Sequence, residues 1–375
     1  MQTVILAAGR GTRMGPLTNT LPKPMLPVAG RPLVEHTVDA AIDAGATRIV
    51  LVVGYESAIV EDHFESETFD VPVSFVQQAE QRGTGDAVRS AVSQLDSGPF
   101  VVLNGDALYD HESLSQLYET GPAVGSYRVP NPEAYGVLQT DGDKVTGVIE
   151  KPADPPSDLI NTGAYVFPAA AREWLDVGES ERGEIELTDV LQRACDHAAV
   201  TPVPFQRWLD VGRPWELLAA NEWKLSELDG EIRGEVSDDA HLDGTVTVES
   251  GATVRPGVVI EGPAYIGENA SVGPNAYVRG ATMLGPDTKT GHSVEIKNSV
   301  VMRDTSVGHL SYVGDSVLGE DVNFGAGTVV ANLRHDDSTV RATVKGERTD
   351  TGRRKFGVVC GPARRPGSIR RLTRA

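Results

Sequence analysis

Residues 260–285 read IEGPAYIGENASVGPNAYVRGATMLG, a stretch in which an apolar side chain returns at every sixth position. The same step connects Val236, Leu242, Val248, Val254, Ile260, Ile266, Val272, Val278, Leu284, Thr290, Ile296 and Met302. Two five-residue steps then reset the frame, and the series continues through Val307, Val313, Leu318, Phe324 and Val330. Neither a helix nor an ordinary strand has a period of six. Because about three hexapeptides make one triangular coil of a β-solenoid, we predict a left-handed parallel β-helix over residues 229–361.

The first 220 residues have a different pattern, in which short apolar runs alternate with amphipathic stretches. VILAAG, RIVLVVG, VSFVQQ and FVVLNGD are typical of buried parallel strands, since they are short and rich in β-branched residues. Segments 32–44 and 85–94 lie between them and are predicted to be helices. This alternation predicts a doubly wound, Rossmann-like α/β domain with ligands outside the carboxyl ends of its strands. We place it at residues 1–228, where 214–228 form a closing helix that begins with Pro.

The repeat is interrupted near its end. Residues 332–354 are polar and off period, which predicts a loop that projects from one coil. KFGVVCGP, residues 355–362, resumes the pattern, and five of the 13 residues that follow are Arg. We interpret this atypical tail, residues 362–375, either as an interaction arm or as the product of an out-of-frame gene end.

Composition excludes several classes of protein. The chain has 375 residues, 40% of them hydrophobic, which suits two domains with separate cores. No apolar run is long enough to span a membrane, and without a basic N-terminal region we expect a cytoplasmic protein. The net charge of −19 disfavours nucleic acid and anionic membrane as partners. Only eight of the 34 basic residues are Lys, and we interpret this acidic, Lys-poor composition as adaptation to a salty, halophilic cytoplasm. Two Cys are too few for a disulfide framework.

A glycine-rich turn follows the first predicted strand, within LAAGRGTRMGPLTNTLPKP, residues 6–24. Backbone N–H groups in such a turn can bind an anion, and Gly9 and Gly11 permit close approach of a phosphate. The spacing is not that of a Walker A loop or of a dinucleotide-binding fingerprint. The basic residues Arg13 and Lys23 follow this turn.

This run resembles the signature of the nucleotidylyltransferase superfamily that makes sugar nucleotides. The resemblance implies that the nucleotide binds at Ala7, Ala8, Gly9 and Gly11. It further implies that Arg13 neutralises the triphosphate and the departing pyrophosphate, while Lys23 grips the phosphate under attack. In this reaction an oxygen of the sugar-1-phosphate attacks the α-phosphorus in line, and catalysis is positioning plus charge neutralisation.

Further segments follow in the order that this superfamily requires. QQAEQRGTGDA, residues 77–87, resembles its base-reading loop, with Gln78, Gly83 and Thr84 as nucleotide-binding residues. The Gln amide can match the edge of a pyrimidine, while Gly leaves room for the ring. Asp86 is a departure, because the bacterial bifunctional enzymes usually carry His there. The resemblance implies UTP or dTTP as the nucleotide.

Two Asp residues are the predicted metal ligands. Asp106 ends LNGD and Asp210 lies in WLDVG. Two carboxylates that converge at strand ends suit a Mg²⁺ ion whose remaining ligands are substrate phosphates. The segments AYGVL, IEKP and NTGAYVF lie between these residues and by resemblance cradle the sugar. The sugar-1-phosphate would then contact Gly136, Glu150, Lys151 and Asn161.

Within the repeat, YVRG, VEIKN and VGHLSYVGDSVLGEDVNFGAGTVVANL resemble the acetyltransferase half of the bifunctional N-acetylglucosamine-1-phosphate uridylyltransferase/glucosamine-1-phosphate acetyltransferase. The resemblance implies that His309 is the general base for the attacking amine, with acetyl-CoA as acyl donor. The acetyltransferase substrates would contact Arg279, Lys297, Tyr312, Asn323 and Ala326. In that family further coils build the coenzyme A groove, so we expect a weak or inactive acetyltransferase. The family also implies a homotrimer joined through the β-helix.

Two other interpretations stay open. WLDVG and EKP look more like a glucose-1-phosphate thymidylyltransferase, which indicates a single-activity thymidylyl- or uridylyltransferase with a structural β-helix. Pyrophosphorylase-like regulatory subunits are a third class, but those typically lose the signature residues that this chain keeps. The archaeal bifunctional type combines all these features, and it implies N-acetylglucosamine-1-phosphate as the main sugar substrate. From sequence alone, a chain truncated after Leu228 is expected to be monomeric and to retain nucleotidylyl transfer.

Overall fold

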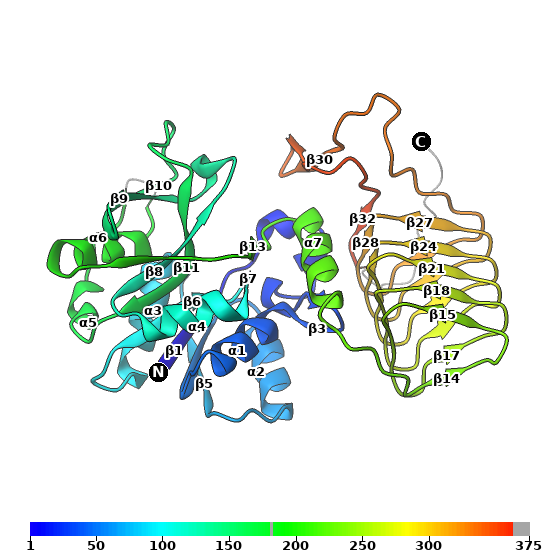
Figure 1. Ribbon diagram of the computed structural model, residues 1–375. Coiled ribbons are helices and arrows are strands. Elements are labelled where there is room, and N and C mark those ends of the chain that lie inside the picture. Colours follow the sequence, from blue (N-terminus) through cyan, green and yellow to red (C-terminus); the bar gives the residue numbers. More distant parts are fainter. Residues whose placement is uncertain (181–182, 363–375) are drawn as a thin grey trace. The chain divides into compact units, whose positions relative to one another are not determined.

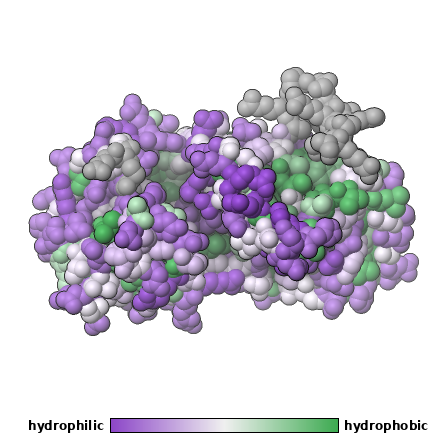
Figure 2. Space-filling view, turned by 90° about the horizontal axis from the view of Figure 1, so that it is seen from above, coloured by the Kyte–Doolittle hydropathy of each residue, from purple (hydrophilic) through white to green (hydrophobic). Residues whose placement is uncertain are grey.

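The computed structural model describes residues 1–180 and 183–362, so the tail from residue 363 onward lies outside the described residues. Its packing divides the chain into two compact units (Figure 1). The N-terminal unit contains residues 1–10, 22–25 and 33–210, and the C-terminal unit contains residues 11–21, 26–32 and 211 onward. Among the described residues, no helix is long and apolar enough to cross a membrane. Hydrophilic residues predominate on the face shown in Figure 2, with smaller hydrophobic patches between them.

A mixed sheet forms the centre of the N-terminal unit. Its strands run in the spatial order β10 (Lys144–Glu150), β9 (Gly136–Asp141), β11 (Leu159–Phe167), β6 (Phe100–Asn104), β1 (Gln2–Ala7), β4 (Arg48–Val53) and β5 (Val73–Gln77). Off this path, β8 (Ala123–Arg128) pairs with β11, and β12 (Thr201–Pro204) pairs with β8. The four predicted strands are β1, β4, β5 and β6, and they pair in parallel. The doubly wound α/β prediction is therefore confirmed.

Helices cover this sheet. They are α1 (Leu33–Asp43), α2 (Ser57–Ser66), α3 (Thr84–Ala91), α4 (His111–Glu119), α5 (Ala171–Trp174) and α6 (Leu187–His197). The segments predicted as helices form α1 and α3, the latter continued by the 3-10 turn η4 (Val92–Gln94). Apolar residues of α3 and α6, such as Val88 and Leu191, share one buried cluster with Val4 and Val50 of the sheet. At the start of α4, the Asp110 carboxylate caps the helix by accepting a hydrogen bond from the backbone of Ser113.

The carboxyl ends of the parallel strands meet at one edge of the sheet. There the backbone N–H of Gly105 donates to the Leu6 carbonyl at 3.0 Å, and that of Gln78 donates to the Val53 carbonyl at 2.8 Å. At the same edge, β7 (Ala107–Tyr109) follows β6 and pairs with β13 (Trp208–Asp210) in an antiparallel ribbon. The segments that carry the predicted base-reading and metal residues are thus next to this edge.

Three parallel sheets form the β-helix of the C-terminal unit, as predicted (Figure 1). The first contains β14 (Glu235–Val236), β17 (Thr253–Val254), β20 (Ser271–Val272), β23 (Lys289–Thr290), β26 (Ser306–Val307) and β29 (Asn323–Phe324). The second contains β15 (His241–Asp243), β18 (Val259–Glu261), β21 (Tyr277–Arg279), β24 (Glu295–Lys297) and β27 (Tyr312–Gly314). The third contains β16 (Val246–Val248), β19 (Ala264–Ile266), β22 (Thr282–Leu284), β25 (Val300–Val301), β28 (Val317–Leu318) and β32 (Val359–Cys360).

One position of the predicted repeat is wrong. The frame was expected to reach Met302 before its first five-residue step, but Val301 is the residue that pairs with Leu284 below and Leu318 above. The shorter step therefore lies between Ile296 and Val301. Met302 is also buried, so apolar character alone could not distinguish the two neighbours.

The off-period segment contains a hairpin, formed by β30 (Arg341–Val344) and β31 (Glu347–Asp350). The chain leaves the coil after Val330 and rejoins it at Phe356, whose buried ring packs edge-on against Trp215 of α7 (Pro214–Leu225). Arg353 forms an ion pair with Glu222 of the same helix. The predicted closing helix begins at Pro214 as expected, but it ends at Leu225 instead of Leu228.

Parts of the glycine-rich signature belong to the C-terminal unit, a feature that sequence did not predict. Asn221 of α7 is fully buried and joins two segments: its Oδ1 accepts from the Ala29 N–H at 3.0 Å, and its Nδ2 donates to the Ala281 carbonyl at 3.0 Å. The ring of Tyr265 lies so close to Gly30 that a Cβ there would sit 2.3 Å from its Cζ. Residues 26–32 are therefore packed directly against the β-helix and α7.

Candidate active site

The two predicted metal ligands flank one ribbon. Asp106 directly precedes β7, Asp210 ends β13, and Asp210 stands opposite Ala107 in the antiparallel register. Lys23, which is only 5% exposed, directs its Nζ to Oδ2 of Asp106. The ribbon thus brings both carboxylates to one end, where a buried cation already neutralises part of their charge.

The carboxylates of Asp106 and Asp210 at this ribbon fit a hard cation whose remaining ligands come from the substrate. Within residues 1–180 and 183–362, no cluster of three or more His, Cys, Asp or Glu could bind a metal by itself. The same residues supply no hydrogen-bond donor to Oδ1 of Asp106. Mg²⁺ in nucleotide sites takes one or two carboxylates and completes its shell with phosphates and water. Asp106 and Asp210 match that need.

Tyr109 supports the turn that carries Asp106, and sequence reasoning missed it. Its buried hydroxyl donates to the Asn104 carbonyl at 3.3 Å and accepts from the Asn104 N–H at 3.2 Å. Burial, and secondarily the nearby Asp106 charge, raise the pKa of Tyr109 well above its ordinary value. The hydroxyl therefore remains protonated and can keep this position at any physiological pH.

The predicted phosphate-binding turn begins where β1 ends. Ala7 and Ala8 are buried, and the Ala8 carbonyl accepts a hydrogen bond from Nε2 of Gln81 at 2.8 Å. Gly9 is exposed, and a Cβ added there would meet nothing within 4 Å. The open space around Gly9 fits the expectation that a ligand approaches the backbone at this position.

The remainder of that signature lies in the C-terminal unit. Gly11 has a left-handed φ of 67°, and its carbonyl accepts from the Thr18 hydroxyl at 3.0 Å. Arg13 follows in the 3-10 turn η1 (Thr12–Met14) with an exposed side chain. An exposed guanidinium is available to an anionic ligand.

The predicted base-reading residues lie between the end of β5 and the first residue of α3. Gln78 is buried directly after β5, and its Nε2 donates to the Gly83 carbonyl at 3.1 Å. The hydroxyl of Thr84 accepts a hydrogen bond from the backbone of Leu187 at 3.0 Å. The structure thus brings Gln78 and Gly83 together, whereas the Thr84 hydroxyl is already engaged with the start of α6.

Three of the four predicted sugar-binding residues converge. Gly136 of β9 stands opposite Glu150 of β10, and Nδ2 of Asn161 donates to the Gly136 carbonyl at 3.2 Å. Lys151 points its Nζ at Oε1 of Glu150 at 3.1 Å but is half exposed. Gly136, Glu150 and Asn161 therefore form one polar cluster, with the Lys151 cation at its margin.

Tyr165 orients Asn161 within this polar cluster. Its hydroxyl donates to Oδ1 of Asn161 at 2.7 Å, and the same oxygen accepts from the Gly163 N–H at 3.1 Å. Burial raises the pKa of Tyr165 far above the physiological range, so this donor is permanent. Nδ2 of Asn161 keeps a second hydrogen, for which the described part of the chain offers no acceptor. Tyr165 lies in the NTGAYVF segment, four residues after Asn161.

We expect Gly136→Ala to raise the KM for the sugar phosphate about tenfold or more, with a smaller effect on the KM for the nucleotide. A Cβ at Gly136 would lie 2.3 Å from Nδ2 of Asn161 and 2.9 Å from Oε2 of Glu150, so both side chains must move. Steady-state kinetics with each substrate varied in turn measures this. Gly178→Ala, at an exposed position after α5 where a Cβ would meet nothing within 4 Å, is the control, and equal changes in both KM values would contradict the assignment.

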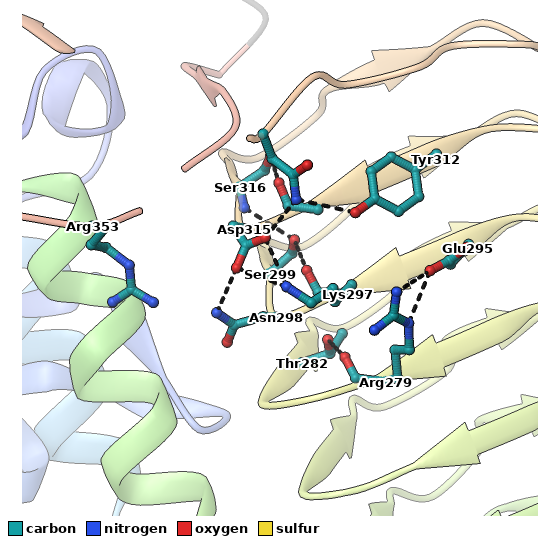
Figure 3. Close-up of polar contacts among 12 residues, drawn as sticks. Arg279, Thr282, Glu295, Lys297, Asn298, Ser299, Tyr312, Asp315, Ser316 and Arg353 are labelled. Atoms are coloured by element: carbon teal, nitrogen blue, oxygen red, sulfur yellow. Dashed lines mark hydrogen bonds and ion pairs between the residues drawn. The ribbon is translucent and has the colours of Figure 1, made fainter. Parts of the chain in front are cut away.

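The predicted sugar-phosphate ligands of the β-helix are both paired with carboxylates (Figure 3). Arg279 and Lys297 occupy adjacent rungs of β21 and β24. Arg279 holds Glu295 at 2.7 Å, and Lys297 holds Asp315, which is only 3% exposed, at 2.9 Å. A phosphate at this face would have to share these cations with acidic neighbours.

The other predicted acetyltransferase residues lie on different parts of the coil. The hydroxyl of Tyr312 accepts from Nδ2 of Asn332 at 3.1 Å, beside Asp315. His309 is exposed at the corner between β26 and β27, and Ala326 stacks one coil further along, over Gly308. Asn323 is exposed on β29, in a different sheet from Tyr312. Within one chain, Lys297 and Tyr312 both lie close to Asp315. The six predicted acetyltransferase residues, however, do not meet at one point.

Known protein families match most of the chain. The nucleotidyl transferase family matches residues 2–227, and the GMPPB C-terminal domain family matches residues 260–356. The bifunctional protein GlmU of Methanococcus vannielii is 41% identical over 96% of this chain and 88% of its own length. The bifunctional sugar-1-phosphate nucleotidylyltransferase/acetyltransferase of Sulfurisphaera tokodaii is 38% identical over 98% of this chain and 91% of its own length. The crystal structure of a UDP-glucose pyrophosphorylase with UDP-glucose is 25% identical, with a TM-score of 0.55, and it covers 60% of this chain and 99% of that one.

Proposed function

Because this chain belongs to the nucleotidyl transferase family and is a sugar-1-phosphate nucleotidylyltransferase, we propose that it uses UTP or dTTP and acts chiefly on N-acetylglucosamine-1-phosphate. The Lys23–Asp106 pair beside Asp210 at the carboxyl edge of the sheet supports nucleotidylyl transfer, and the resemblance to the archaeal bifunctional proteins supports the choice of sugar and base. A buried ammonium and two carboxylates at the ligand-binding edge of the sheet suit phosphoryl-transfer chemistry.

Each predicted site residue would have a separate role in the reaction. Lys23 binds the phosphate under attack, and its contact with Asp106 fixes the direction of the ammonium. Glu150 and Asn161 orient the sugar so that its phosphate oxygen lies in line with the leaving pyrophosphate. Arg13 neutralises charge on the leaving group. Mg²⁺, held by Asp106 and Asp210, would supply further positive charge to the phosphates.

A substrate panel tests the choice of sugar and base. UTP, dTTP and CTP are each combined with N-acetylglucosamine-1-phosphate, glucosamine-1-phosphate and glucose-1-phosphate, and pyrophosphate release is followed. We expect the highest kcat/KM for N-acetylglucosamine-1-phosphate with UTP or dTTP. A clear preference for glucose-1-phosphate would favour the single-activity thymidylyl- or uridylyltransferase instead.

We expect acetyl transfer from acetyl-CoA to glucosamine-1-phosphate to be weak or absent. The pairing of Arg279 and Lys297 with Glu295 and Asp315 lowers their attraction for the sugar phosphate. Thiol release from acetyl-CoA is compared between the unmodified chain and His309→Ala, and both should equal background. Robust turnover that disappears in His309→Ala would show that a complete acetyltransferase site exists.

We also expect a homotrimer joined through the β-helix. Leu310 is 62% exposed and Val329 is 75% exposed near β27, so apolar side chains remain for a neighbouring chain to cover. Light scattering at micromolar concentration should give the mass of three chains. High salt is the appropriate condition, because the acidic, Lys-poor composition predicts a halophilic protein. A monomer under these conditions would contradict the proposal.

A further inference from the structure

The amide of Gln78 is held in one orientation by its neighbours. Its Nε2 donates to Oδ2 of Asp86 at 2.9 Å and to the Gly83 carbonyl at 3.1 Å, which engages both of its hydrogens. Asp86 in turn accepts from the Arg89 guanidinium at 2.5 Å. Gln78 and Asp86 are buried, at 6% and 8% exposure, so solvent does not readily replace these bonds.

Chemistry alone determines which end of this amide points outward. An ionised carboxylate and a backbone carbonyl can only accept hydrogen bonds, and the Nε2 group can only donate. If the amide turned over, its oxygen would face two acceptors, and neither pair could form a bond. The described residues provide no donor to Oε1 of Gln78. The part of the Gln78 amide that remains available to a ligand is therefore Oε1, which is a hydrogen-bond acceptor.

We infer that Asp86 is a positioning residue that makes Gln78 select uracil or thymine over cytosine. The inference rests on the proposed function, in which Gln78 faces the base-pairing edge of the nucleotide. Uracil and thymine carry an N–H at N3, whereas N3 of cytosine is a bare acceptor. A fixed acceptor at Gln78 binds the first two bases and repels the third. A Gln free to turn over could serve either kind of base.

Asp86→Asn tests this inference with almost no change in shape. An Asn at this position can donate as well as accept, so only the Gly83 carbonyl still disfavours the turned-over amide of Gln78, and its preference for one orientation is weakened. We expect the ratio of kcat/KM for UTP to that for CTP to fall by about tenfold or more relative to the unmodified chain. The control is Asp96→Asn, the same substitution at an exposed position after η4, which should leave the ratio unchanged.

The possible outcomes separate the inference from the proposed function. If Asp86→Asn lowers turnover of UTP and CTP equally, Asp86 has only a structural role and the inference is wrong. If the unmodified chain uses UTP and CTP equally well, the fixed amide does not select the base, and the inference is again wrong. If no pyrimidine triphosphate yields pyrophosphate with any sugar phosphate, the proposed function itself fails.

Discussion

Replacing Asp106 by Asn should lower kcat for pyrophosphate release by about two to three orders of magnitude while the protein stays folded. The substitution keeps the shape of the side chain but removes the charge that holds Lys23 and would hold Mg²⁺. Pyrophosphate release under saturating substrates measures the effect, and circular dichroism verifies the fold.

The control for this variant is Asp143→Asn, in the exposed turn between β9 and β10, which should retain full activity. Excess EDTA should abolish the activity of the unmodified chain, and added Mg²⁺ should restore it. Full activity of Asp106→Asn, or of the unmodified chain in EDTA, would contradict the proposed metal site.

Removing the β-helix after Leu228 should reduce nucleotidylyl transfer about a hundredfold, because small displacements of phosphate-binding groups have effects of that size. From sequence alone the truncated chain was expected to remain active. The structure changes this expectation, since residues 11–21 and 26–32, on both sides of Lys23, pack in the unit that contains the β-helix. Truncation would remove Tyr265 from Gly30 and leave the Asn221 amide without the Ala281 carbonyl.

A single substitution distinguishes the support that the β-helix gives to residues 26–32 from its effect on the general stability of the chain. Tyr265→Ala removes only the ring that lies against Gly30, and it should lower kcat for nucleotidylyl transfer while the β-helix remains assembled. Tyr277→Ala, in a different sheet of the same β-helix, should leave kcat unchanged. Equal kcat values for these two variants, or a fully active truncated chain, would show that the signature segment needs no support from the β-helix.

Periodic features were the most predictable from sequence. A six-residue step repeats over many coils, so it fixes which side chains point inward even when one five-residue step is placed incorrectly. Met302 shows the limit of that reasoning, because it is as buried as its neighbour Val301 and only strand pairing identifies the rung. The parallel strands were recognised for a similar reason, since each is a short continuous apolar run.

Features that depend on distant contacts were not predictable. Asn221 joins Ala29 across 192 positions of sequence, and an Asn within an amphipathic helix gives no sign of such a bond. Asp86 was recognised only as a departure from the family pattern, because its effect on Gln78 depends on how a loop and a helix meet. The charge pairing of Arg279 and Lys297 likewise required the register of adjacent coils.

Pyrophosphate release from UTP in the presence of Mg²⁺ and N-acetylglucosamine-1-phosphate is the most direct test of the central claim. We predict that release requires the sugar phosphate and that one nucleotide sugar forms for each pyrophosphate. Failure to release pyrophosphate with any sugar-1-phosphate, or release that proceeds equally without one, would contradict the account.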